Sequence, residues 1–364
     1  MVGSEKLDSA DMSIFHGWID QLPNKDVAMR NLTLRLLLAL SLAPSMATAA
    51  AQSNASTEPR LLDTVVVSGH VTGPGFWQVY KDDEHDLWIM GTLSPRPANI
   101  QWDATEAKRL VSGADLVLWP AMYGVDIKSN IFQQAILGYG YLKAQKNPNG
   151  KTLKEVVSPE LYARWLQAKA IYMPRNSSVE RQRPLTAAQE LLDAAVKLSR
   201  LSKEPIIVPA LGETIKAGQI PQLQPRFIVH LTNAQAKAAL TDVRHQDLND
   251  VRCLEATLDS IEQDMPRMVA NANAWATGEI DKLSFNALAK REALCADAMM
   301  NPEFSAKYGI PNIPTSISNE WLKEAEKAMS TKGVTVAFLP IENLVGPGNV
   351  LDMLRAKGYT VNGP

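Results

Sequence analysis

Strand-forming segments lie near the two ends of this chain, and a long helix-forming stretch separates them. Residues 76–81 and 86–91 are aromatic and aliphatic runs around a polar turn, which is the pattern of a β-hairpin. Residues 233–300 contain almost no glycine or proline, which favours long helices. Residues 333–361 predict a strand, a helix and a parallel strand in succession. We therefore expect an α/β fold: a mixed central sheet with an N-terminal β-hairpin, a large helical insertion and a C-terminal βαβ unit.

Three segments inside the insertion carry local signals of their own. Ser158 is a good N-cap residue ahead of a helix over residues 159–172. Thr186 and Gln189 form a capping-box pattern, which predicts the start of a second helix. Residues 205–209 read Pro-Ile-Ile-Val-Pro and predict a short strand bounded by prolines.

Residues 29–51 have the three parts of an export signal: a basic start, a short apolar run and a small-residue cleavage zone. The run is too short to cross a hydrocarbon core of about 30 Å, so we expect no transmembrane anchor after signal cleavage. We interpret residues 1–28 as an extension ahead of the true translation start at Met29. Residues 52–60 are then a linker and residues 61–364 one domain, so we predict a periplasmic or secreted protein.

Composition restricts both partners and chemistry. With 37 basic and 39 acidic residues the formal net charge is −2, so we expect no nucleic-acid partner. In an oxidising compartment Cys253 and Cys295 would form a disulfide; the alternative is two separately buried thiols. The five histidines show no ligand spacing, so we expect no metal ion and no cofactor.

Three short motifs carry a family resemblance. Residues 87–94 read Leu-Trp-Ile-Met-Gly-Thr-Leu-Ser, residues 274–280 read Ala-Trp-Ala-Thr-Gly-Glu-Ile, and residues 343–347 read Asn-Leu-Val-Gly-Pro. In order and spacing they resemble the Gly-Thr-Ile-His, Ala-Trp-x-x-Gly-Asp-Leu and His-Leu-Val-Gly motifs of the TraB/GumN family, which is related to the Tiki metalloproteases. The resemblance implies the TraB/GumN fold, which agrees with the α/β fold expected above. It also implies that the protein is located in the Gram-negative bacterial envelope.

The sequence departs from that family where the chemistry would lie. The two motif histidines are replaced by Ser94 and Asn343, and a glutamate common near the end of a strand is replaced by Trp119. A catalytic zinc site needs about three ligands from His, Asp, Glu or Cys, and neutral oxygen donors are poor substitutes. Glu342 is the only acid left in either motif, so we expect no metalloprotease chemistry.

The resemblance also implies a binding cleft built from the motif residues. Its candidates are Gly91, Thr92, Ser94, Arg291, Glu342 and Asn343. Glu342 is the candidate catalytic residue. Arg291 is interpreted as an anion or carboxylate clamp facing the cleft or, alternatively, as a surface or ion-paired arginine.

We therefore expect a non-catalytic relative of metal-dependent hydrolases that binds a small molecule, a glycan or an envelope protein. One alternative is a hydrolase with a reorganised site that uses Glu342 and Arg291. The other, implied by the family's association with exopolysaccharide gene clusters, is an accessory factor in exopolysaccharide production or export.

Overall fold

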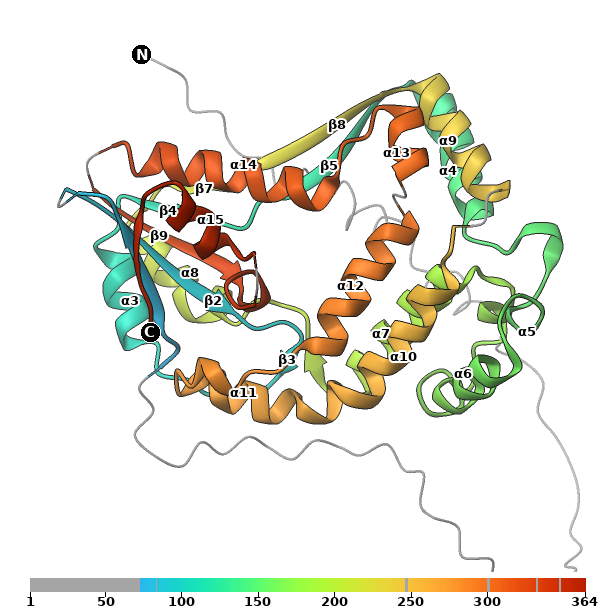
Figure 1. Cartoon of the computed structure of the whole chain (residues 1–364), viewed down its shortest axis with the longest axis horizontal. Helices are drawn as coiled ribbons and strands as arrows, with labels where there is room; N and C mark the ends of the chain where they lie inside the picture. Colours follow the sequence, from blue (N-terminus) through green and yellow to red (C-terminus); the bar gives the residue numbers. More distant parts are fainter. Residues whose placement is uncertain (1–72, 83, 246–247, 300–301, 332, 347) are drawn as a thin grey trace, which may run out of the picture. The chain divides into compact units, whose positions relative to one another are not determined.

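The computed structural model describes residues 73–82, 84–245, 248–299, 302–331, 333–346 and 348–364 (Figure 1). The predicted upstream extension, export signal and linker therefore lie outside the described residues. None of the helices in the described ranges is both long enough and apolar enough to cross a membrane.

A six-stranded mixed sheet forms the centre of the fold. Its strands are β1 (Phe76–Tyr80), β2 (His85–Thr92), β4 (Leu116–Leu118), β7 (Gln222–Leu223), β9 (Gly333–Pro340) and β10 (Thr360–Asn362). They lie in the order β10-β1-β2-β9-β4-β7. β1 and β2 are antiparallel, as the hairpin prediction required, whereas β9 runs parallel to β2 and to β4. The predicted mixed α/β sheet is confirmed.

The C-terminal strand-helix-strand unit closes this sheet. It consists of β9, helix α15 (Val350–Ala356) and β10. β10 pairs antiparallel with β1, which is itself antiparallel to β2, so β10 and β9 run in the same direction. The parallel crossover predicted from sequence is confirmed, but both strands of the hairpin lie between its two strands.

The helical insertion lies between β4 and β9 in the sequence and includes a second, two-stranded sheet. That sheet pairs β5 (Met122–Lys128) in parallel with β8 (Arg226–Thr232), and neither strand was predicted. The α-helices of the insertion are α4 (Ile131–Ala144), α5 (Leu153–Val156), α6 (Pro159–Tyr172), α7 (Pro184–Leu198), α8 (Ile207–Ala217), α9 (Asn233–His245), α10 (Val251–Gln263), α11 (Met268–Ala276), α12 (Asn286–Met299), α13 (Pro302–Tyr308) and α14 (Ile313–Ala328).

One local prediction in the insertion is wrong and the start of a second is shifted by two residues, and proline explains both. The segment predicted as a strand over 205–209 leads into α8, whose first turn contains Pro209. Proline is tolerated there because the first N–H groups of a helix have no partner within the helix. Helix α7 likewise begins at Pro184, ahead of the predicted start at Thr186. Leu211 and Ile215 are buried one turn apart, which is a helical pattern that the short apolar run concealed.

The two cysteines join helices α10 and α12. The sulfur atoms of Cys253 and Cys295 lie 1.97 Å apart, which is the separation of a disulfide bond. The pairing predicted from sequence is therefore present in the structure, and the alternative of two separate thiols is not.

Candidate functional site

The first and third motifs meet at one edge of the central sheet. β2 and β9 pair in parallel, with Gly91 opposite Leu339 and Thr92 opposite Pro340. Ser94 and Glu342 each follow the last of these pairs by two residues, so both leave the sheet at the same edge. In α/β sheets, ligands bind beyond the carboxyl ends of parallel strands. The predicted cleft residues are therefore concentrated where such a site is expected.

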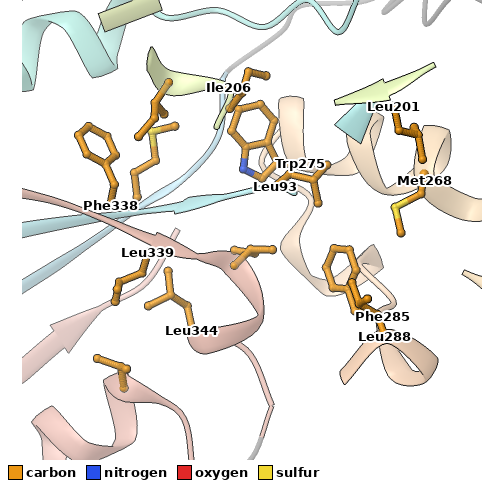
Figure 2. Packing of buried hydrophobic residues seen from close by; sticks show 14 of the residues in the cluster. Leu93, Leu201, Ile206, Met268, Trp275, Phe285, Leu288, Phe338, Leu339 and Leu344 are labelled. Carbon is orange, nitrogen blue, oxygen red and sulfur yellow. The ribbon is translucent and has the colours of Figure 1, made fainter. Parts of the chain in front are cut away.

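Gly91 and Thr92 have structural roles: each contacts a neighbouring element closely. A Cβ atom on Gly91 would lie 2.2 Å from Cδ1 of Ile341, so only glycine permits this approach. The Gly91 carbonyl accepts a hydrogen bond of 2.7 Å from the indole N–H of Trp275, which comes from the middle motif. Figure 2 shows the Trp275 side chain among the buried apolar side chains of the core. The hydroxyl of Thr92 donates to the carbonyl of Leu339 at 3.2 Å. These two candidates therefore hold the strand ends together.

Trp275 is a site residue to which sequence reasoning gave no role. Its side chain is fully buried. A buried indole has one donor, and that donor needs an acceptor. The bond to Gly91 joins the first and second motifs across α11 and β2, so the three motifs form one structural unit.

Ser94 belongs to a polar network. Its hydroxyl donates to the backbone carbonyl of Lys203 at 3.0 Å. The ammonium group of Lys203 pairs with Asp193, and the side-chain amide of Gln189 donates to the same carboxylate at 3.0 Å. Gln189 in turn accepts a hydrogen bond of 3.0 Å from Arg291. A chain of polar contacts thus connects Ser94 with Arg291.

Arg291 is held between helices. Its side chain is buried, and it donates to Thr257 at 3.2 Å as well as to Gln189. Burial lowers the pKa of Arg291, and the charges of Glu292 and Asp193 partly offset this effect. Neither proposed role of Arg291 matches these contacts closely, because its bonded partners are neutral side chains. We interpret it as a residue that positions α12 against α7 and α10.

Glu342 lies in a single turn of 3₁₀ helix (Ile341–Asn343) that directly follows β9. Burial raises the pKa of its carboxyl from 4.5 to about 7, the backbone N–H of Glu342 opposes this, and the charge of Glu292 raises it further. Asn343 beside it is exposed. A carboxyl with this pKa is half-protonated near neutral pH, so it can both donate and accept hydrogen bonds there.

Glu292 is the second acid of the site, and sequence reasoning missed it. It follows Arg291 in α12 and is exposed, but desolvation by the surrounding protein raises the pKa of its carboxyl, and the charge of Arg291 opposes this. The only signal in the sequence was its position next to Arg291.

The metal site implied by the resemblance does not fit these residues. The hydroxyl of Ser94 is engaged by the Lys203 carbonyl, and Asn343 offers only a neutral amide. Glu342 and Glu292 are two carboxylates without a third anionic or imidazole ligand. In the part of the chain that the structure describes, no three His, Cys, Asp or Glu side chains are arranged to hold a metal ion. Two carboxylates fall one short of the three protein ligands that a catalytic zinc site usually has beside its water.

The position that commonly carries a glutamate in the family has a packing role here. The indole N–H of Trp119 donates to the side chain of Gln222 at 3.0 Å, and its ring centre lies 5.3 Å from that of Phe338. Trp119 therefore covers the sheet beside β9 and brings no charge to the site.

Comparison with protein-family models matches residues 75–363 to the family described as TraB/PrgY/gumN. The match covers most of the chain and all three motifs, and it confirms the family predicted from them. No curated protein and no solved structure matches the chain.

Proposed function

Because this chain belongs to the TraB/PrgY/gumN family, we propose that it is an exported envelope protein that uses the family fold to bind a ligand without metal-dependent hydrolysis. The observation that carries this proposal is the donor set at the ends of β2 and β9. Ser94 and Asn343 occupy the two motif positions, and Ser94 already donates to Lys203. Neutral oxygen donors of this kind bind zinc poorly.

The two acidic residues, Glu342 and Glu292, indicate that the ligand carries hydrogen-bond donors. Glu342 is partly desolvated, and the charge of Glu292 raises its pKa further. Carboxyl oxygens accept hydrogen bonds, most strongly from cationic donors. A small molecule, glycan or envelope-protein segment that presents hydroxyl or ammonium groups would satisfy them. We place the binding surface at the edge formed by Ser94, Glu292, Glu342 and Asn343.

Metal analysis tests the proposal directly. The purified protein is dialysed, exposed separately to zinc and manganese, and analysed for bound metal and for peptide hydrolysis. We expect substoichiometric metal and no hydrolysis. The proposal is wrong if the protein binds one metal ion per chain and hydrolyses peptides, and if Glu342→Ala abolishes both. Glu213→Ala, on the exposed surface of α8, is the matched control.

A hydrolase with a reorganised site is the second candidate, and the pKa of Glu342 favours it. General bases work best when their pKa is near the operating pH, and burial raises that of Glu342 to about 7. Under this candidate Glu342→Gln would abolish turnover of a peptide or glycan substrate. Glu292→Gln would leave activity but move its pH profile to lower pH, because a repelling charge is removed. Arg291 would act here only as a positioning residue.

The cellular location is a separate part of the proposal. It rests on the three-part pattern over residues 29–51, with translation starting at Met29 and one domain over 61–364. N-terminal sequencing of protein recovered from the periplasm or medium tests it. We expect a terminus near residue 50; recovery of residues 1–28 on exported protein would contradict the proposed start.

A further inference from the structure

Helix α4 exposes an apolar face. Its exposed apolar side chains include Phe132 at 78%, Ile136 at 57%, Tyr139 at 61% and Leu142 at 42% exposure. The first three are spaced at i, i+4 and i+7, so they form one stripe along the helix. Contiguous exposed apolar surface of this kind on a soluble protein marks an interaction site.

The adjacent side of α4, which faces α9, is apolar as well, and it is already covered. Leu137 and Ala144 are buried, and a Cβ atom on Gly140 would lie 3.3 Å from Cδ1 of Leu240 in α9. α4 and α9 lie side by side at one end of the β5–β8 ribbon (Figure 1). A helix that is apolar on all sides is stable in water only if each side is covered. The α9 side of α4 has its cover within the chain, and the stripe has none among the described residues.

Positive charge surrounds the stripe. Lys143, Lys237 and Arg244 line the groove between α4 and α9, and none of them has a described carboxylate within ion-pair distance. The ammonium of Lys143 lies 4.5 Å from the ring centre of Tyr139. α4 contains no acidic residue, and Asp242 on α9 is already engaged by Lys307. An anionic partner therefore complements this face.

We propose that the exposed face of α4, with its basic rim, docks onto the surface of an anionic phospholipid bilayer. Aromatic and aliphatic side chains flanked by Lys and Arg are the composition of helices that lie in the headgroup layer. At 14 residues α4 is about 21 Å long, so it lies along the surface and does not cross the bilayer. A second copy of the chain is disfavoured because a symmetric contact through α4 would bring the two basic rims together.

Vesicle sedimentation with the full chain tests this inference. The vesicles are phosphatidylcholine alone or phosphatidylcholine mixed with phosphatidylglycerol. The apolar variant is Phe132→Ser with Ile136→Ser, and the charge variant is Lys143→Gln with Lys237→Gln. The matched control is Leu166→Ser with Val208→Ser, since these residues are 45% and 51% exposed on other helices. Residues 29–51 are the same in all four proteins, so differences report on α4. Thermal unfolding checks that each variant is folded.

We expect the wild type and the matched control to bind the anionic vesicles, and to bind less as salt is added. The apolar variant should lose at least about tenfold in partitioning, which corresponds to partial burial of two large side chains. The charge variant should lose its preference for anionic over neutral vesicles. Equal binding by the wild type and the apolar variant overturns the proposal, as does failure of the wild type to bind. A dimer that the apolar variant abolishes also overturns it and assigns the face to a second copy.

Discussion

The ionisation of Glu342 makes a quantitative prediction about stability. Its carboxyl has a pKa of about 7 in the folded protein, against an ordinary value of 4.5, mainly because the surrounding protein desolvates it and then because Glu292 repels its charge. A group with a raised pKa binds its proton more tightly in the folded state than in the unfolded state. The stabilisation is therefore complete below about pH 4.5 and is lost as the pH rises through about 7.

The magnitude follows from the size of the shift. Each pKa unit corresponds to about 1.4 kcal/mol, so the difference between 4.5 and about 7 is about 3 kcal/mol. Glutamine resembles the protonated acid in shape and carries no charge at any pH. Glu342→Gln should therefore match the wild type near pH 4.5 and be more stable by up to about 3 kcal/mol at pH 8.

Urea unfolding of both proteins at several pH values between 4.5 and 8 measures this difference. The contributions of other titrating groups to the free energy of unfolding cancel in this difference, because the wild type and the variant share those groups. Glu213→Gln, at an exposed position on α8, should show no such dependence on pH. A difference between Glu342→Gln and wild type that stays constant across this range would refute the reasoning, since it would show that the carboxyl of Glu342 is ordinarily solvated.

Three further predictions concern the contacts that join the motifs. Gly91→Ala forces a Cβ atom against Ile341 and should destabilise the protein by about 1–3 kcal/mol in urea unfolding. Trp275→Phe leaves the buried Gly91 carbonyl without its donor, and we expect a loss of about 1–3 kcal/mol by the same measurement. Replacing Cys253 and Cys295 together by serine opens a loop with a sequence separation of 42 and should cost about 4 kcal/mol; an unchanged melting temperature would contradict this.

Local sequence signals were sufficient for the elements that depend mostly on neighbouring residues. The hairpin over β1 and β2 was predicted from two runs and a polar turn, and α6 from the cap at Ser158. The strand predicted at 205–209 is wrong because three apolar residues between two prolines are too few to show either a strand or a helix period. The β5–β8 ribbon was missed because each strand is recognisable only beside its partner, about a hundred residues away.

For the candidate site, too, some features were determined by the sequence and others only by the tertiary structure. The sequence alone determined the family, the replacement of two histidines by Ser94 and Asn343, and the presence of Glu342 in the third motif. Only the tertiary structure decided that Ser94 is engaged by a backbone carbonyl and that Arg291 is bonded between helices.

It also decided that Glu292 raises the pKa of Glu342 and that α4 leaves an apolar stripe exposed. Composition and spacing specify which groups a chain carries. Charge repulsion, desolvation and exposure depend on distances between residues far apart in sequence, and those distances exist only once β2, β9 and the insertion have packed together.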